Sequence, residues 1–179
     1  MNVARLYVYS LITRWLPETR FFELKARLLR WCGAEVGKNV RINSSVRVIG
    51  TGQLVIGDDV WIGANCFFSP VGTAQIRVGN HVDIAPGCTI ITGSHYVDVD
   101  GEHIGGQGVS ASVRIDDGCW LGARALVLPG VFLAKKTLVA AGAVVTKSVD
   151  ISCCLLAGVP AEVKKRFTVN TTVAIGKND

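Results

Sequence analysis

The chain has 179 residues, enough for one domain with a sizeable core, and 49% hydrophobic with 18% charged residues predicts an ordered globular protein. Its formal net charge of +5 favours an anionic ligand or surface, but aromatic residues are few and no basic run alternates with them, which argues against nucleic acid as a partner. Six cysteines without a C-x-x-C pair indicate reduced thiols in a cytoplasmic protein rather than a disulfide framework.

The N-terminal segment, residues 1–35, is predicted to be helical. We expect two helical pieces between Val3 and Arg30, separated at Pro17. The segment is apolar, but Arg5 and Arg14 interrupt it and no small-residue cleavage site follows, so we expect neither a signal peptide nor a membrane span. Two interpretations stay open. The favoured one is a cap over the end of the following core, and the other is a basic amphipathic surface that rests on a membrane.

From Val36 to Val163 the sequence repeats with a period of six, in which an aliphatic residue is followed four positions later by a small or apolar one. In the second half the aliphatic slot holds Leu121, Val127, Leu133, Val139, Val145 and Ile151. This period fits neither an amphipathic helix nor an alternating strand, but it matches a short strand and a turn repeated as the face of a coil. We therefore predict a mainly β coil. Cys66, Cys88 and Cys119 occupy the small slot and are expected to be packing groups rather than nucleophiles.

The rhythm stops after Ile90 and resumes near Ile115, and the intervening polar excursion begins "ITGSHYVDVDGEHIGGQG". We expect a loop over residues 95–112 with His95 at its root, held by the coil and facing outward. Loops that leave a rigid scaffold are where binding and catalysis tend to be placed. On these grounds alone, a turn histidine is more often an ordinary surface residue.

Four segments resemble the hexapeptide-repeat acyltransferases: "VGNHVDIAPGCTIITGSH", "IDDGCWLGARALVLPGV", "VAAGAVVTKSV" and "LAGVPAEVKKR". They look like the maltose and galactoside O-acetyltransferase branch and, at longer range, the acetyltransferases of surface polysaccharide synthesis. The resemblance implies a left-handed parallel β-helix. We accordingly divide the chain into an N-terminal helical cap (1–35), a β-helix acyltransferase domain (36–163) and a C-terminal tail (164–179).

The resemblance implies that His95 is the general base. A neutral imidazole can take the proton of a sugar hydroxyl while that hydroxyl attacks a thioester. Its other ring nitrogen should be held by a carbonyl or a carboxylate, and Asp98 and Asp100 are nearby in the sequence. Asn65 lies 30 residues before His95, a spacing that matches an acceptor-binding asparagine of the galactoside branch, although a turn asparagine is also usual there. Trp120 matches a family tryptophan that walls the cleft.

The donor implied by the resemblance is acetyl-CoA, with no metal, bound in a groove between subunits of a homotrimer. Small residues would let CoA approach, a Thr-Lys pair would lie near its nucleotide, and lysines of the tail would hold phosphate. These residues are Gly122, Ala123, Ala141, Gly142, Thr146, Lys147, Lys164 and Lys165. Glu162 stands where relatives often carry a basic residue, which puts the phosphate contacts in doubt. A backbone N–H near Gly122 is the expected oxyanion donor.

We therefore predict a cytoplasmic enzyme, at the inner face of the membrane if its N-terminal segment contacts lipid, that moves an acetyl group from acetyl-CoA to a sugar hydroxyl. The acceptor would be a small or lipid-linked glycan in surface polysaccharide or O-antigen synthesis. Transfer to an amino sugar, serine or an antibiotic is the alternative. A zinc enzyme of the γ-carbonic anhydrase kind needs three histidine ligands, and His95 and His103 are not spaced as that family's close pair. A non-catalytic scaffold would not need both the histidine loop and "VVTK".

Overall fold

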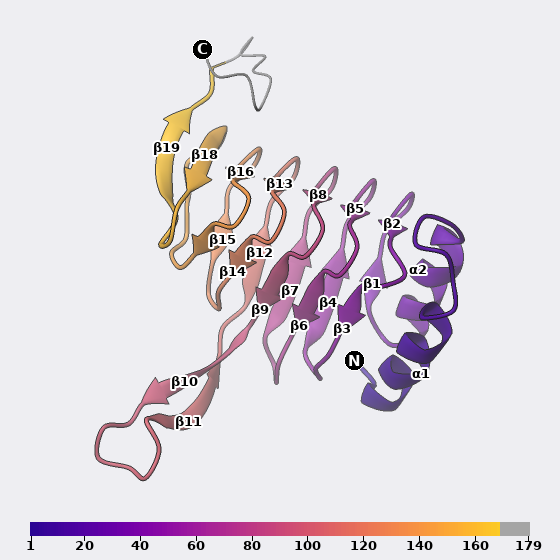
Figure 1. Ribbon diagram of the computed structural model, residues 1–179, viewed down its shortest axis with the longest axis horizontal. Coiled ribbons are helices and arrows are strands. Elements are labelled where there is room, and N and C mark those ends of the chain that lie inside the picture. Colours follow the sequence, from indigo (N-terminus) through magenta and orange to yellow (C-terminus); the bar gives the residue numbers. More distant parts are fainter. Residues whose placement is uncertain (169–179) are drawn as a thin grey trace.

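Two helices and a column of short strands make up the computed structural model, which describes residues 1–168 (Figure 1). Helices α1 (Val3–Thr13) and α2 (Phe22–Trp31) come first and lie at one end of the column. The strands then visit three faces in turn, so that each face becomes a parallel sheet. This is the predicted mainly β architecture, a left-handed parallel β-helix with a short N-terminal helical segment.

Sheets A and C each contain five strands in parallel. Sheet A is built from β1 (Glu35–Val36), β4 (Gln53–Ile56), β7 (Gln75–Val78), β12 (Val113–Ile115) and β15 (Phe132–Leu133). Sheet C is built from β3 (Arg47–Val48), β6 (Phe67–Ser69), β9 (Thr89–Ile91), β14 (Leu126–Val127) and β17 (Val144–Val145).

Sheet B lies between them in the winding order and extends to the C-terminal end. Its strands are β2 (Arg41–Ile42), β5 (Trp61–Ile62), β8 (Asp83–Ile84), β13 (Trp120–Leu121), β16 (Leu138–Val139), β18 (Cys154–Ala157) and β19 (Glu162–Arg166). All of its pairings are parallel except the last, in which β19 runs antiparallel to β18. Strand β19 crosses the boundary at 163/164 that the sequence suggested for the tail.

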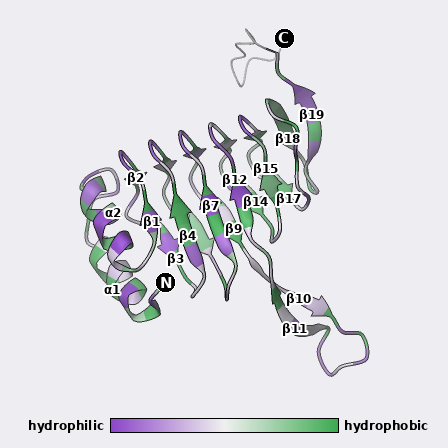
Figure 2. Cartoon of the chain, turned by 180° about the vertical axis from the view of Figure 1, so that it is seen from behind, coloured by the Kyte–Doolittle hydropathy of each residue, from purple (hydrophilic) through white to green (hydrophobic). Residues whose placement is uncertain are grey.

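The period of six arises because each strand contributes one inward aliphatic side chain per face. In sheet B, Ile62, Ile84 and Leu121 are in register and essentially inaccessible to solvent. Figure 2 shows the hydrophobic residues following the strands along the whole column. Burial of each such side chain is worth about 1.5–3 kcal/mol, so this aliphatic column is the main source of stability.

The inward cysteines confirm the expectation that they are packing groups. Cys66, Cys88 and Cys119 are each 1% exposed, and all six cysteines are free thiols. Burial raises the pKa of the Cys119 thiol to about 11, so this thiol stays protonated at neutral pH. A protonated thiol inside the coil is a poor nucleophile.

The coils are also joined at the corner between sheets A and B by a ladder of side chains. Asp58, Asn80 and Asp117 each accept the backbone N–H of the residue one coil earlier, at 2.7, 2.8 and 2.9 Å. Lys135 ends this ladder with an ion pair to Asp117 at 3.2 Å. The hydrogen bond from the Asn80 amide, followed by that from Lys135, holds the pKa of Asp117 below its ordinary value.

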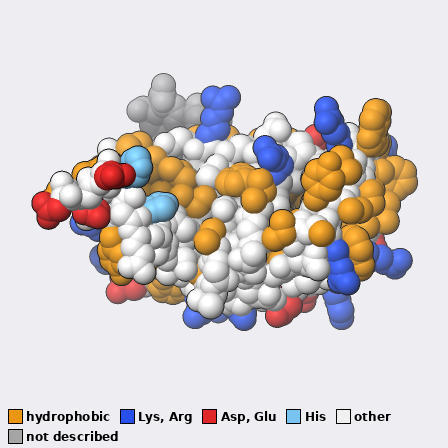
Figure 3. All heavy atoms as spheres, turned by 90° about the horizontal axis from the view of Figure 1, so that it is seen from below, with side chains coloured by type: hydrophobic (Ala, Val, Ile, Leu, Met, Phe, Trp, Pro, Cys, Tyr) orange, Lys and Arg blue, Asp and Glu red, His pale blue; other side chains and the backbone are white. Residues whose placement is uncertain are grey.

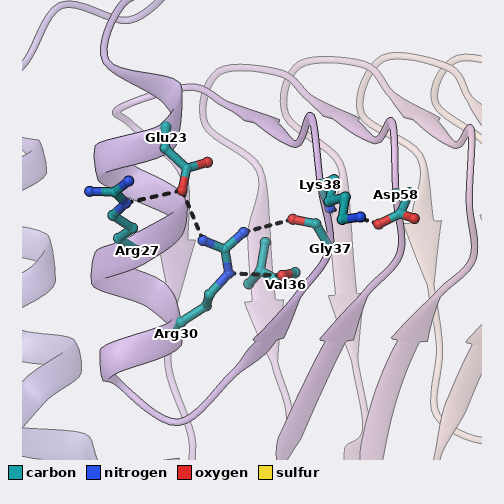
Figure 4. A network of polar contacts seen from close by, with 7 residues as sticks. All are labelled: Glu23, Arg27, Arg30, Val36, Gly37, Lys38 and Asp58. Atoms are coloured by element: carbon teal, nitrogen blue, oxygen red, sulfur yellow. Dashed lines mark hydrogen bonds and ion pairs between the residues drawn. The ribbon is translucent and has the colours of Figure 1, made fainter.

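The two helices cover the first coil. Leu6 and Tyr9 of α1, with Ala26 and Leu29 of α2, are buried in the same cluster as the interior of the coil. Figure 4 shows the polar contacts that accompany this packing. Arg30 donates to the carbonyl oxygens of Val36 at 2.8 Å and Gly37 at 2.7 Å, and Glu23 accepts hydrogen bonds from both Arg27 and Arg30 at 3.1 Å.

A buried lysine holds the turn between the helices. Lys25 is fully buried, and its Nζ donates to the Glu18 carbonyl at 2.8 Å, the Ser44 hydroxyl at 3.1 Å and the Pro17 carbonyl at 3.4 Å. Burial lowers the pKa of Lys25. Because a buried cation is costly without such partners, these bonds tie the turn to the first coil. No helix among residues 1–168 has the length and apolar content needed to cross a membrane.

We predict that Lys25→Ala lowers the free energy of unfolding by about 2–4 kcal/mol, because it leaves a cavity and removes the only printed donor to two carbonyl groups. Urea denaturation measures the loss. Lys38→Ala is the matched control, since the Lys38 side chain is exposed and should change stability by no more than about 0.5 kcal/mol. Equal losses for both variants would contradict the role assigned to Lys25.

Candidate active site

His95 lies in a β-hairpin that projects from the column between β9 and β12 (Figure 1). Strand β10 (Gly93–Val97) pairs antiparallel with β11 (Gly105–Ser110), and His95 is opposite Gly108. The expectation of a loop over residues 95–112 is therefore corrected to a hairpin over 93–110. Glycines that read as turn signals are part of its second strand.

A backbone carbonyl orients the imidazole of His95. The Nδ1 atom is 2.8 Å from the carbonyl oxygen of Gly106, while the side chain is otherwise exposed. Because a carbonyl oxygen can only accept, the proton of this bond must be on Nδ1. In the neutral ring, Nε2 is then free to accept a proton. Of the two partners that the sequence left open, the carbonyl is the one observed.

Asp98 has a different task. Its Oδ1 accepts the backbone N–H groups of Asp100 at 3.2 Å and Gly101 at 3.0 Å, which closes the hairpin turn. A Cβ atom on Gly106 would lie only 2.8 Å from the Cβ of Asp98. Gly106 therefore has to be glycine for β11 to approach β10 closely enough to present its carbonyl to His95. Nothing in the sequence pattern distinguished Gly106 from its neighbouring glycines.

Asn65 lies at the corner between sheets B and C, before β6. Its backbone is left-handed, with φ 58°, and its N–H donates to the Ser45 hydroxyl at 2.9 Å. Ser45 N–H donates in turn to the carboxylate of Glu18 at 3.2 Å. The turn bound by Lys25 thus reaches Asn65 through two hydrogen bonds, and this leaves the amide side chain at the surface.

The Asn65 side chain lines an open pocket of about 570 Å³ between α1 and the first coils. The wall from the helical segment contributes Tyr7, Ser10, Leu11, Thr13, Arg14, Leu16 and Glu18, and the wall from the coils contributes Ser44, Ser45, Val46 and Arg47. None of the ion pairs formed within residues 1–168 involves Arg14 or Arg47. The pocket is therefore polar and basic, although neither arginine stood out in the sequence.

His95 and Asn65 lie on opposite edges of sheet C. Strands β6 and β9 are parallel neighbours, and Asn65 precedes β6 whereas His95 follows β9. With about 3.3 Å per residue, the width of the sheet separates the two residues by on the order of 10 Å. A single chain does not bring them together around one hydroxyl group.

The candidate CoA residues divide between the same two edges. Gly122, Ala123, Ala141 and Gly142 share the B–C corner with Asn65, and we call this the Asn65 edge. Thr146 and Lys147 follow β17 and share the C–A corner with the hairpin, and we call this the His95 edge.

The two glycines on the Asn65 edge have different structural reasons. A Cβ on Gly122 would lie 2.6 Å from the backbone nitrogen of Ala141, so glycine is needed there for the coils to stack. Gly142 has φ +70°, and nothing lies within 4 Å of the place a Cβ would take, so its outer side is open. The N–H of Gly122 donates to the Val139 carbonyl at 2.8 Å. It is therefore not free to be the oxyanion donor, because the ladder between coils uses it.

Trp120 lies on the outer surface of sheet B, 44% exposed, rather than beside the hairpin of its own chain. Both Trp120 and Trp61 pair with Asp83 in register. The two tryptophans thus occupy the same column of the repeat, as the alternative of a positional preference predicted. Trp120 is two residues before Gly122 and so is nearer the Asn65 edge.

Charges at the C-terminal end partly cancel. Glu162 accepts a hydrogen bond from Lys164 at 2.9 Å. That bond, helped by the charge of Lys147, holds the pKa of Glu162 below its ordinary value. Two of the lysines expected to bind phosphate therefore have an ionised carboxylate close to them. Lys165 lies beside them in the exposed strand β19.

No cluster of three or more His, Cys, Asp or Glu side chains suited to a metal ion occurs in residues 1–168. The three histidines are also dispersed. His81 lies at the corner between sheets A and B, 3.7 Å from Asp59, while His95 and His103 are in the hairpin segment.

Comparison with known proteins shows similarity to repeat-containing transferases. The family model described as "Hexapeptide repeat of succinyl-transferase" matches residues 53–91 and 112–147, which flank the hairpin. Over 142 residues the chain is 34% identical to the "Putative colanic acid biosynthesis acetyltransferase WcaF" of Escherichia coli (strain K12), covering 79% of this chain and 74% of that protein. It is 34% identical over 146 residues to a "Galactoside O-acetyltransferase" of Lactococcus lactis, covering 81% and 69%.

Solved structures are similar in fold. A maltose O-acetyltransferase from Clostridium difficile 630 superimposes with a TM-score of 0.62 and 19% identity, covering 93% of this chain and 87% of that one. The acetyltransferase VCA0836 of Vibrio cholerae, complexed with acetyl coenzyme A, gives 0.65, 19% identity and the same coverage. The N-acyltransferase AntD of Bacillus cereus, in complex with dTDP and coenzyme A, gives 0.66 and 20% identity, covering 86% of this chain and 93% of that one.

Proposed function

We propose, since the chain belongs to the hexapeptide-repeat acetyltransferases, that it transfers an acetyl group from acetyl-CoA to a hydroxyl group of a sugar in surface polysaccharide or O-antigen synthesis. The observation that carries the proposal is the contact between His95 Nδ1 and the Gly106 carbonyl, which leaves Nε2 as a proton acceptor at the surface. The two curated relatives, one named for colanic acid biosynthesis and one for galactosides, support a carbohydrate acceptor.

The chemistry assigned to His95 follows from this tautomer. Nε2 takes the proton of the acceptor hydroxyl while its oxygen bonds to the thioester carbonyl carbon. The imidazolium then returns the proton to the departing sulfur, so the ring is neutral again after one turnover. The Gly106 carbonyl keeps the ring oriented and stabilises the imidazolium in between, as a carbonyl acceptor can do for a donating Nδ1–H.

We propose that the enzyme is a homotrimer in which the Asn65 edge of one subunit faces the His95 edge of its neighbour. This arrangement would bring Asn65 and His95 to one site, which a single chain does not do. The acetyl-CoA residues on the two edges would meet in the same groove, with Ala123, Ala141 and the open side of Gly142 on one wall. Thr146, Lys147, Lys164 and Lys165 would lie toward the nucleotide end.

We propose that the pocket beside Asn65 receives the acceptor sugar. Asn65 would orient the reacting hydroxyl, and Trp120 would wall the cleft on the same edge. Arg14 and Arg47 suit an acceptor that carries negative charge, such as a sugar attached through phosphate to a nucleotide or a lipid. The six free thiols favour a cytoplasmic location, where thiols stay reduced.

A panel of acceptors tests the proposed function. The enzyme is mixed with acetyl-CoA and a galactoside, a maltoside, an amino sugar, serine or an aminoglycoside, and CoA release is followed by thiol titration. We expect transfer to sugar hydroxyls, verified by the mass and linkage of the product. Acetylation of amines alone, or of serine alone, would contradict the proposal.

His95→Ala is expected to lower kcat by about 10²–10⁴-fold with little change in CoA affinity, because the base acts in the transition state. Steady-state kinetics and calorimetric CoA titration separate the two quantities. His103→Ala is the matched control, since His103 is exposed in the same hairpin segment and should leave kcat unchanged. Activity of His95→Ala within a few-fold of wild type would refute the general-base role.

Asn65→Ala is expected to raise the acceptor KM or lower kcat by roughly 2- to 10-fold, the worth of one neutral hydrogen bond, while CoA affinity is unchanged. Asn39→Ala makes the same change at another left-handed corner residue, φ 54° against 58°, and so controls for backbone strain. If Asn39→Ala has the same kinetic effect, Asn65 acts only through the turn.

The same two site variants test the trimer. Co-assembled His95→Ala and Asn65→Ala subunits should regain activity, because roughly a quarter of randomly formed sites combine an intact His95 with an intact neighbouring Asn65. Sedimentation gives the subunit number. An active monomer, or no gain on mixing, would overturn the shared site.

A further inference from the structure

Helix α1 is apolar on two opposite sides. Leu6, Tyr9 and Thr13 face the coil and are buried. A second apolar stripe runs along the other side and continues past the helix end, and we call it the outer face. It consists of Val3, Tyr7, Val8, Leu11, Ile12 and Trp15. Its spacing of three and four residues makes it one continuous surface rather than scattered side chains.

The outer face is strongly exposed for its chemistry. Trp15 is 87% exposed, Tyr7 66% and Val3 54%, and Leu11 is 44% exposed. A helix that is apolar all round is normally covered on every side. Since the coil already occupies the inner side, the outer face needs a partner of its own, and clustered exposed apolar side chains commonly mark such contacts.

The charges around this face are of one sign. Residues 1–17 contain no Asp or Glu. Arg5, Arg14 and Arg20 flank the stripe, and Arg5 is held in place by a hydrogen bond to the Trp31 carbonyl at 2.9 Å. The nearest carboxylates in sequence are engaged elsewhere, with Glu18 bonded to the Ser45 amide. Figure 3 shows apolar side chains with Lys and Arg among them at the helical end of the molecule.

We propose that the outer face of α1 docks on the surface of an anionic lipid bilayer. Its eleven residues are too short to span a membrane, so the helix would lie in the plane of the interface. Trp15 and Tyr7 are residue types that favour the boundary between headgroups and acyl chains, and the flanking arginines complement anionic headgroups. The inner side caps the coil while the outer side binds lipid.

Docking in this orientation has a consequence for catalysis, and this part rests on the proposed function. Tyr7 and Leu11 belong both to the outer face and to the pocket beside Asn65, and Arg14 also lines that pocket. The pocket would therefore open at the membrane surface. A sugar attached through phosphate to a lipid could enter it without leaving the bilayer.

The test is vesicle co-sedimentation of the intact protein at low salt. We expect binding to vesicles of phosphatidylcholine mixed with phosphatidylglycerol and much weaker binding to phosphatidylcholine alone. Trp15→Ser should lower the partition coefficient by roughly ten-fold, since one large apolar side chain is withdrawn from lipid. Arg20→Gln should lower it by roughly five-fold on anionic vesicles only.

Matched controls keep the result interpretable. Trp120→Ser and Arg77→Gln remove an exposed tryptophan and an exposed arginine of the coil, and vesicle binding should be unaffected by either. Because Trp15 lies outside the pocket lining, Trp15→Ser should keep its activity on a soluble sugar, and that activity is measured separately from binding. Failure of the proposed function would therefore leave the vesicle result standing, and the reverse holds too.

Three outcomes would overturn the proposal. The first is the absence of binding to anionic vesicles, and the second is equal binding by Trp15→Ser and wild type. The third is a change of subunit number in Trp15→Ser measured by sedimentation, which would show that the outer face is a contact between copies of the chain.

Discussion

The stacking of successive coils is the constraint on which the rest of the molecule depends. Parallel strands must lie about 4.8 Å apart, so each corner has to pass directly over the corner before it. Gly122 shows how little room remains, since a Cβ there would come within 2.6 Å of the next coil's backbone. The aliphatic interior and the corner ladder of Asp58, Asn80 and Asp117 then hold the coils in register.

This regularity has a chemical cost, because backbone groups used between coils cannot serve a ligand. The amide of Gly122 is an example, being bonded to Val139. Catalytic groups are consequently found where the winding is broken. The hairpin after β9 frees the Gly106 carbonyl from the coil and turns it toward His95. Sheet C, which cannot be interrupted without opening the core, keeps His95 apart from Asn65 and so favours a site completed by a neighbouring subunit.

The end of the coil presents the opposite problem, because the interior of the first turn would be open to water. Helices α1 and α2 close it, and the buried Lys25 ties their connection to Ser44. The same connection leads through Glu18 and Ser45 to Asn65. Stability of the cap and placement of the acceptor pocket are thus parts of one hydrogen-bonded unit, with the apolar outer face of α1 beside it.

The sequence by itself determined the coil and the position of its interruption, because a six-residue period and the polar excursion at His95 are local patterns. It also placed Cys66, Cys88 and Cys119 inside, since their slot in the repeat is always inward. Only the tertiary structure decided that the excursion is a hairpin, that the partner of His95 is Gly106 rather than Asp98, and that the amide of Gly122 is occupied. The physical reason is that these facts depend on which backbone groups remain unpaired after the strands stack. The pocket of Arg14, Arg47 and Asn65 was hidden for a related reason, since it forms only when α1 packs beside coils distant in the chain.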